Sequence, residues 1–177
     1  MDPVRQHETE KYRKMWDIPN YRVLSPGYQH INNVYKRLDL QPGDTVLDFG
    51  VGSGKAADFL CKREIHVHGI DIVDNCLDKG VLDHPYFTFS TECLWDLEDN
   101  YSAGYVYCTD VMEHIPPEHV DAVLDNIDRS MLKAGYFSIS CCGDNFGPKY
   151  LNEELHLTVR SPQWWAERLE ERWDIDW

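Results

Sequence analysis

A glycine-rich segment directly after a short apolar run is the feature that most restricts how this chain can fold. Residues 45–49 carry β-branched and aromatic side chains, follow a Pro-Gly-Asp turn and have the length of a buried parallel strand. The next residues, 50–54, read Gly-Val-Gly-Ser-Gly and lead into a predicted helix over 53–61. Glycines permit the tight turn and the close backbone approach that ligands require at such junctions. The junction therefore predicts an α/β fold with a ligand site at the carboxyl end of this strand.

Strand and helix patterns alternate along most of the remaining chain. Apolar runs predict further strands over 65–70, 86–89, 104–108, 136–141 and, at the end of the chain, 173–177. Helical patterns cover 74–82, 117–132 and 162–171. This alternation predicts right-handed βαβ units, and so a doubly wound, mostly parallel Rossmann-like sheet with helices on both faces.

The first 40 residues precede the alternating pattern. Two extra helices, predicted over 8–16 and 28–38, are separated by turn-forming stretches. We expect residues 1–40 to form a helical cap over the ligand site of a single domain that spans residues 1–177. Four aromatic residues of this segment either shape the ligand pocket or pack as ordinary core: Tyr12, Trp16, Tyr21 and Tyr28.

Charge and composition argue against several classes of partner. The formal net charge of -14 disfavours duplex nucleic acid and anionic membranes, because both present negative charge to the protein. No apolar run approaches the roughly 20 residues that span a bilayer, and the polar start of the chain lacks the core of a signal peptide. We therefore expect a cytoplasmic protein. Its six cysteines show no Cys-x-x-Cys spacing and are expected to be reduced.

An acidic residue distinguishes the glycine-rich segment from a dinucleotide-binding loop. Gly50, Gly52 and Gly54 do not have the Gly-x-Gly-x-x-Gly spacing, and Asp48, two places before the first of them, would repel a pyrophosphate. A ligand with a cationic amino-acid end tolerates that charge. Residues 46–54 closely resemble the first motif of class I methyltransferases, which use S-adenosylmethionine (SAM). The resemblance implies that Asp48 lies near the methionyl amino group and that the glycines admit the cofactor to the backbone; the alternative is a turn that merely joins strand to helix.

The next two strands carry further residues for the cofactor. Asp71 ends the predicted second strand 23 positions after Asp48, near the spacing at which nucleoside-binding folds place a ribose-binding acid. The resemblance implies that Asp71 accepts hydrogen bonds from both ribose hydroxyls and that Ile72 packs on the adenine, although Ile72 could equally be core. Glu92 and Cys93 match best the positions that present an acidic side chain and a backbone amide to the adenine; Asp96 is the alternative acid.

Residues 109–117 are similar to the fourth-strand segment of small-molecule and quinone-type methyltransferases, which lies beside the sulfonium. Methyl transfer is an in-line displacement that requires positioning of the acceptor, with a base where the acceptor carries a proton. His114 is the first candidate base, because an ordinary pKa of about 6.5 suits proton removal near neutrality. Glu113 and Asp110 come next, and His156 is a further candidate. The alternative for His114 is a hydrogen bond at a helix start.

The resemblance implies transfer of the SAM methyl group to an O or N atom of a small-molecule acceptor, which leaves S-adenosylhomocysteine. A SAM-binding partner or regulatory subunit without activity is the alternative, and a nucleotide or modified base is a less favoured acceptor. No metal site is expected. Asp110 with Asp144 and Asn145 resembles the magnesium ligands of catechol-type enzymes, but the Asp-Asn-x-Gly run is ordinary loop chemistry.

The end of the chain departs from the family pattern. Family members usually finish with a two-stranded hairpin, whereas few residues follow the last predicted helix, so we expect a shortened C-terminal edge of the sheet. The missing strand is either absent or supplied by residues 149–159. A second copy could cover an exposed edge, so the chain is expected to be a monomer or a homodimer. Residues 14–27 also resemble compact methyltransferases encoded by phages.

Overall fold

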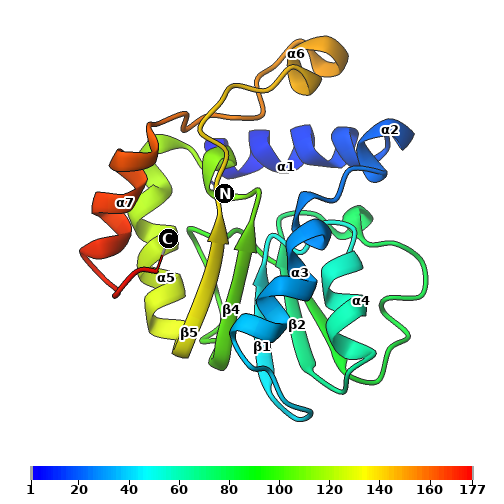
Figure 1. Cartoon of the computed structure of the whole chain (residues 1–177). Coiled ribbons are helices and arrows are strands. Elements are labelled where there is room, and N and C mark those ends of the chain that lie inside the picture. Colours follow the sequence, from blue (N-terminus) through cyan, green and yellow to red (C-terminus); the bar gives the residue numbers. More distant parts are fainter. Residues whose placement is uncertain (1, 177) are drawn as a thin grey trace.

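Five parallel strands form the centre of the fold, in the spatial order β3-β2-β1-β4-β5 (Figure 1). The computed structural model describes residues 2–176. The strands are β1 (Thr45–Phe49), β2 (His66–Asp71), β3 (Phe87–Thr91), β4 (Ala103–Thr109) and β5 (Met131–Ser138). Each neighbouring pair is parallel, so the carboxyl ends of all five strands lie at the same edge of the sheet. The predicted α/β Rossmann-like sheet is confirmed.

Helices cover both faces of the sheet, as predicted (Figure 1). Ile31 of α3 (Pro26–Arg37) and Leu60 of α4 (Lys55–Cys61) share one buried cluster with Val46. Ile127 of α5 (Val120–Ser130) and Trp165 of α7 (Pro162–Glu170) share the cluster on the opposite face. The alternation of side chains along the buried strands supplies apolar groups to both clusters. Three short 3-10 helices complete the central part: η1 (Asp74–Cys76), η2 (Met112–His114) and η3 (Pro117–His119).

The N-terminal helices lie across the carboxyl ends of the strands (Figure 1). Helix α1 (Pro3–Trp16) begins earlier than the predicted residue 8, because Asp2 accepts a hydrogen bond from the Val4 amide (3.0 Å) and so caps its start. Helix α2 (Pro19–Arg22) forms within a stretch predicted as a turn. Helix α1 packs against η1 and against α6 (Phe146–Leu151), which the sequence did not predict. Helices thus cover the carboxyl ends of the strands.

The helix predicted over 74–82 is wrong. Only the three residues of η1 are helical there, and Leu77 already has an extended backbone. The Arg22 guanidinium donates hydrogen bonds to the carbonyl oxygens of Asn75 (2.8 Å), Cys76 (3.0 Å) and Leu77 (2.9 Å). In a longer helix these oxygens would instead accept hydrogen bonds from backbone amides of the next turn. Gly80, with a φ of +95°, continues the loop.

The strand predicted over 173–177 is also wrong where the structure describes it, over 173–176; Trp177 lies outside the described residues. The Trp173 ring stacks on Phe137 of β5 with centroids 5.4 Å apart, and its indole N–H donates to Asp128 (2.8 Å). Side-chain packing thus replaces strand pairing. Residues 149–159 add no strand either, so β5 is an edge of the described sheet, which agrees with the shortened C-terminal edge that we predicted.

The structure also bears on the cysteines and on membranes. The six cysteines are free thiols, and four of them are buried. Across residues 2–176, every helix is too short or too polar to cross a bilayer.

Arg22 is expected to hold the N-terminal helices in place. Besides the three carbonyls of the η1 region, its guanidinium donates to the Trp16 carbonyl (3.1 Å) and pairs with Asp78 (3.2 Å). A lysine side chain has a single nitrogen and cannot make all of these hydrogen bonds. Arg22→Lys should therefore lower the free energy of unfolding by about 1–3 kcal/mol. Amide hydrogen exchange should increase over residues 12–22 and 74–78. Denaturant unfolding and exchange mass spectrometry measure these effects.

The matched control is Arg37→Lys. Arg37 forms an exposed ion pair with Asp176, so its replacement should change stability by less than about 0.5 kcal/mol. Equal effects of the two variants would show that Arg22 does not hold the cap.

Candidate active site

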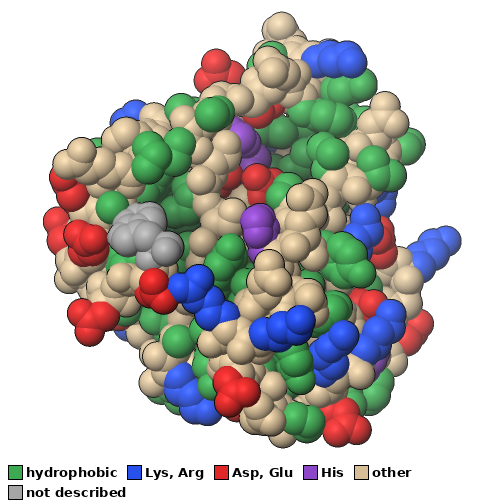
Figure 2. Space-filling view, in the orientation of Figure 1, with side chains coloured by type: hydrophobic (Ala, Val, Ile, Leu, Met, Phe, Trp, Pro, Cys, Tyr) green, Lys and Arg blue, Asp and Glu red, His purple; other side chains and the backbone are tan. Residues whose placement is uncertain are grey.

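A continuous cleft lies between the strand ends and helix α1. Two cavities of about 610 and 690 Å³ compose it, and both are lined by Trp16, Tyr21, Gly50, Gly52 and Asp110. These volumes include space that is open to solvent, so the two cavities form a half-open cleft and not an enclosed chamber. In Figure 2 a hollow lined by hydrophobic side chains, with histidine and acidic side chains at its edge, opens below α6.

The glycine-rich loop forms one wall of this cleft. Gly50 has a φ of +73°, and a side chain there would meet Val111, whose Cγ2 would lie 2.4 Å from the added Cβ. Gly52 has a φ of +53°, and a Cβ there would lie 3.2 Å from the Trp16 ring. Gly54 begins α4 and does not line either cavity. The loop can therefore follow this path, packed against Val111 and Trp16, only because Gly50 and Gly52 lack side chains.

Two buried carboxylates face the cleft from neighbouring strands. Asp48 of β1 is 3% exposed and lines the second cavity, and Asp71 at the end of β2 is 8% exposed and lines the first. The Gly52 amide donates to Asp71 Oδ2 (3.0 Å), which joins the acid to the glycine-rich loop. Parallel pairing of β1 with β2 places the two predicted cofactor-binding acids on the same side of the cleft.

The electrostatic state of both acids is unusual. Burial raises the pKa of Asp48 to about 8, and the Asp71 charge adds to the rise. Burial also raises the pKa of Asp71 to about 6, against the lowering effect of backbone amides such as that of Gly52. A cationic ligand in the cleft would therefore stabilise the ionised form of both carboxyl groups.

The residues predicted to contact adenine are only partly in the cleft. Ile72 lines the first cavity, together with Leu94 and Trp95. Glu92 lines neither cavity: its carboxylate accepts hydrogen bonds from the Glu98 amide (2.8 Å) and from the Tyr101 hydroxyl. Cys93 is fully buried and also lies outside both linings. The structure thus gives Glu92 a role in holding the loop after β3, and the side chains that reach the cleft come two residues later.

Helix α1 turns one face towards the cleft. Glu8, Tyr12 and Trp16 line the first cavity, and their spacing of four residues puts them on the same side of the helix. Glu8 is 4% exposed and pairs with Lys11, whose Nζ lies 2.7 Å from the Glu8 carboxylate. The aromatic residues of the cap line the pocket, which was one of the two roles that the sequence left open.

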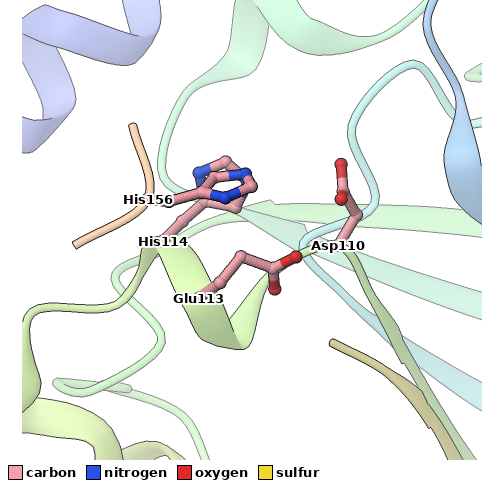
Figure 3. A group of neighbouring side chains, drawn as sticks. All are labelled: Asp110, Glu113, His114 and His156. Atoms are coloured by element: carbon pink, nitrogen blue, oxygen red, sulfur yellow. The ribbon is translucent and has the colours of Figure 1, made fainter. Parts of the chain in front are cut away.

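The side chains predicted for catalysis gather at the end of β4. Asp110 has a φ of +59°, a left-handed conformation that is rare and costly for a residue other than glycine. Glu113 and His114 follow on η2, and His156 joins them from the loop after α6 (Figure 3). The imidazoles of His114 and His156 lie edge to face with centroids 4.7 Å apart. The four side chains are described below as the β4-end cluster.

His114 is held in a network that changes its acid–base properties. Its Nδ1 lies 2.7 Å from the Tyr12 hydroxyl and 3.1 Å from the Leu155 carbonyl oxygen. Burial, together with smaller effects of the neighbouring His156 and Lys11, lowers the pKa of His114 to about 3. The ring is therefore neutral near pH 7. Its pKa lies well below the ordinary value on which the sequence analysis relied.

Glu113 and Asp110 are perturbed in the opposite sense. Glu113 is 0% exposed, and burial and the Asp110 charge raise the pKa of its carboxyl group. Burial also raises the pKa of Asp110. Asp144, which the sequence considered as a magnesium ligand, instead accepts hydrogen bonds from the amides of Gly147 (2.7 Å), Leu155 (2.8 Å) and His156 (3.2 Å). Its carboxylate shapes the loop, as ordinary loop chemistry predicts.

Sequence reasoning missed some residues of the cleft. Glu8, Leu94, Trp95, Val111 and Ile115 were not proposed, although all five line the first cavity. The four-residue spacing of Glu8, Tyr12 and Trp16 could have revealed Glu8, because it defines one helical face. No comparable signal marks Trp95, whose position depends on the turn after β3.

Asp48 is expected to destabilise the chain when no ligand is bound. The folded state holds a proton on Asp48 up to about pH 8, whereas an unfolded aspartate releases it near pH 4. The folded state therefore binds more protons between these values, and the contribution of Asp48 to the free energy of unfolding falls as the pH rises. Asp48→Asn should stabilise the ligand-free chain by about 3–4 kcal/mol more at pH 8 than at pH 5, because each pH unit between the two pKa values changes the free energy of unfolding by about 1.4 kcal/mol. Denaturant unfolding at both pH values measures this difference.

The control is Asp83→Asn, because Asp83 is exposed. This substitution should leave the free energy of unfolding within about 0.5 kcal/mol of the wild-type value at both pH values. A stabilisation of Asp48→Asn that does not depend on pH would contradict the assignment.

Comparison with known proteins bears directly on this site. A family model described as a methyltransferase domain matches residues 22–173. The chain is 28% identical over 162 residues to phosphoethanolamine N-methyltransferase 2 of Caenorhabditis elegans, covering 86% of this chain and 36% of that protein. It is 27% identical over 128 residues to ubiquinone biosynthesis O-methyltransferase of Proteus mirabilis, covering 64% and 51%. The chain thus spans about a third to a half of the length of these relatives.

Solved structures share the fold. The 1,6-didemethyltoxoflavin-N1-methyltransferase of Burkholderia thailandensis, solved with bound 1,6-didemethyltoxoflavin and S-adenosylhomocysteine, gives a TM-score of 0.62 at 14% identity. The match covers 78% of this chain and 64% of that one. Phosphoethanolamine N-methyltransferase 2 of Haemonchus contortus gives a TM-score of 0.65 at 20% identity, with 82% and 37% covered. The resemblance drawn from residues 46–54 is confirmed: this chain belongs to the methyltransferase domain family and has the class I fold.

Proposed function

We propose that this chain binds SAM in the cleft and transfers its methyl group to an N or O atom of a small-molecule acceptor. The observation that carries the proposal is the pair of buried acids, Asp48 and Asp71, which face a glycine-walled cleft at the ends of adjacent strands. SAM carries a cationic sulfonium and a cationic amino group, so it supplies the positive charge that these acids lack. The two curated relatives act, by their names, on N and O atoms.

Each part of SAM has a counterpart in the cleft. Asp48 lies in the second cavity, where it suits the methionyl amino group. Asp71 suits the ribose hydroxyls, since its carboxylate retains acceptor capacity beyond its bond from Gly52. Ile72, Leu94 and Trp95 form the apolar part of the first cavity and suit the adenine ring. In this proposal Leu94 and Trp95 contact the adenine ring, which the sequence analysis had expected of Glu92 and Cys93.

The acceptor side is formed by α1 and the β4-end cluster. Tyr12, Trp16 and Tyr21 supply aromatic walls, and Glu8, Asp110 and His114 supply polar groups within the same cavity. A cleft of this kind, covered on one side by α1, suits a small acceptor. Asp110, Glu113 and His114 act on the acceptor, either by orienting its nucleophilic atom or by receiving its proton.

Cofactor binding is tested by calorimetric titration with SAM, S-adenosylhomocysteine and NAD. We expect micromolar binding of the first two and none of NAD. Asp71→Ala should weaken SAM binding by well over tenfold, because hydrogen bonds to a charged group contribute about 1.5–3 kcal/mol each. Affinity in the wild type should fall as the pH drops from about 8 to below 6, because first Asp48 and then Asp71 takes up a proton. Asp83→Ala is the exposed control and should bind SAM normally; NAD binding alone would refute the cofactor assignment.

Turnover is tested separately with methyl-labelled SAM and a panel of phosphorylated amines and phenols. His114→Ala should reduce kcat by about a hundredfold or more and leave the Kd for SAM within about twofold, because His114 belongs to the acceptor side. SAM binding without transfer to any acceptor would instead favour a regulatory subunit. An unchanged kcat in the variant would remove His114 from the reaction.

A further inference from the structure

The β4-end cluster brings together four side chains that bind metal ions in proteins. Asp110, Glu113, His114 and His156 each offer one ligand atom, and these atoms all lie within 4.8 Å of one another. In Figure 3 the two imidazoles overlap in the view, and the Glu113 and Asp110 carboxylates lie on one side of them. Three of the residues lie within five positions of one another, and the fourth comes from a loop more than 40 positions later. Two nitrogen and two carboxylate donors thus converge on one point.

Both histidines are oriented through the same ring atom. His114 Nδ1 lies 3.1 Å from the Leu155 carbonyl oxygen, and His156 Nδ1 lies 2.6 Å from that of Cys142. A carbonyl oxygen can only accept a hydrogen bond, so the proton of the His156 ring is on Nδ1 and its Nε2 lone pair is available. His114 Nδ1 also lies 2.7 Å from the Tyr12 hydroxyl, which can either accept a hydrogen bond from the ring or donate one to it. With its proton on Nδ1, between the Leu155 carbonyl and the Tyr12 hydroxyl, His114 offers its Nε2 lone pair as well. Metal-binding histidines are commonly fixed in this way, with the other nitrogen donating to a backbone carbonyl.

The carboxylates of the cluster lack a compensating positive charge. Glu113 is 0% exposed, and its Oε1 accepts a hydrogen bond from the Ser140 amide (2.7 Å). Its Oε2 accepts none from an N–H or hydroxyl donor among residues 2–176, and its carboxyl group lies within hydrogen-bond reach of the Asp110 carboxyl group, so the two acids can share one proton when no cation is bound. The cationic side chain nearest to His114 on α1, Lys11, is engaged by Glu8 (2.7 Å) and by the Glu154 carbonyl (3.2 Å). A buried acceptor without a donor is costly, and a second carboxylate beside it adds repulsion. A cation bound between them would remove both costs.

The surrounding chain fixes the cluster in place. Asp144 holds the amides of Leu155 and His156, so the loop that carries His156 is fixed by a carboxylate that is not itself part of the cluster. On the other side, the Thr158 amide donates to the Glu113 carbonyl (2.8 Å), which joins this loop to η2. Such rigid support is what a preformed metal site requires.

We propose that Asp110, Glu113, His114 and His156 form a binding site for one divalent transition-metal ion. The mixed nitrogen and oxygen donors favour ions of the Mn²⁺ to Zn²⁺ series over Ca²⁺ or Mg²⁺, which prefer oxygen ligands alone. This replaces the expectation of no metal site. Because Asp110 and His114 line the cleft, the ion would hold an acceptor oxygen or nitrogen there; this role rests on the proposed function, whereas metal binding does not.

The test is a metal titration of the full chain, without a polyhistidine tag and after dialysis against a chelator. Mn²⁺ binding is followed by the loss of the free-ion electron paramagnetic resonance signal, and Co²⁺ binding by its visible absorption. We expect one equivalent to bind, with Mg²⁺ a weak competitor. Glu113→Gln and His156→Ala should each weaken binding by about tenfold or more. His7→Ala is the control, because His7 is exposed and pairs with Glu153 away from the cluster.

The outcomes separate this inference from the proposed function. Circular dichroism checks that each variant folds; if Glu113→Gln does not, His156→Ala carries the test, since His156 lies on a loop. The absence of saturable binding, or equal binding by the wild type and the folded variants, would overturn the metal site. SAM is titrated into the metal-free chain in parallel. Metal binding without SAM binding would refute only the proposed function, and the reverse would refute only the metal site.

Discussion

Parallel pairing of the strands is the constraint on which the rest of this structure depends. Because β2, β1 and β4 are neighbours that run in the same direction, residues that are far apart in the sequence meet where these strands end. Asp71, Asp48 and Asp110 come from these three strands. The sheet therefore brings negative charge together in a place that water reaches poorly. These neighbouring charges destabilise the fold, and burial of the two apolar clusters on the faces of the sheet offsets that effect.

The helices across the strand ends change the character of this edge. An open edge would let water screen the carboxylates, whereas α1 and its aromatic side chains exclude it. The effect of each charge in the cleft is accordingly larger, on a bound ligand as well as on its neighbours. Glu8 enters the same chamber from α1 but is paired with Lys11, so the cap adds little net charge of its own. The N-terminal helices thus strengthen the electrostatic effect of the carboxylates at the strand ends.

The parts of the fold that depend on local sequence could be predicted. The β1 strand, the glycine-rich loop and Asp71 follow from short patterns, and the structure has them in the expected places. The parts that failed depend on distant residues. The helix expected over 74–82 is prevented by Arg22, more than 50 positions away, whose guanidinium competes for its carbonyl groups. No pattern within residues 74–82 reports that competition.

In the candidate site, too, some features follow from local sequence and others depend on distant residues. The segment that carries Asp110, Glu113 and His114 could be identified from its own residues, whereas its association with His156 depends on how Asp144 folds the intervening loop. The low pKa of His114 depends on its burial beneath α1 and could not be read from the segment itself. Trp173 similarly packs through its ring where the sequence pattern suggested strand pairing.

The position of α1 has a consequence for the order in which the chain can fold. This helix precedes every strand of the sheet in the chain, yet it packs against η1 and α6, which come much later, and its buried Trp16 shares a cluster with Val73 and Cys76. Its own hydrogen bonds are local, so it can form early but has nothing to dock on until the sheet exists. By the same logic it can detach while the sheet stays intact, because none of the strand pairs includes it. The helices that cover the cleft therefore complete their packing only after the sheet has formed.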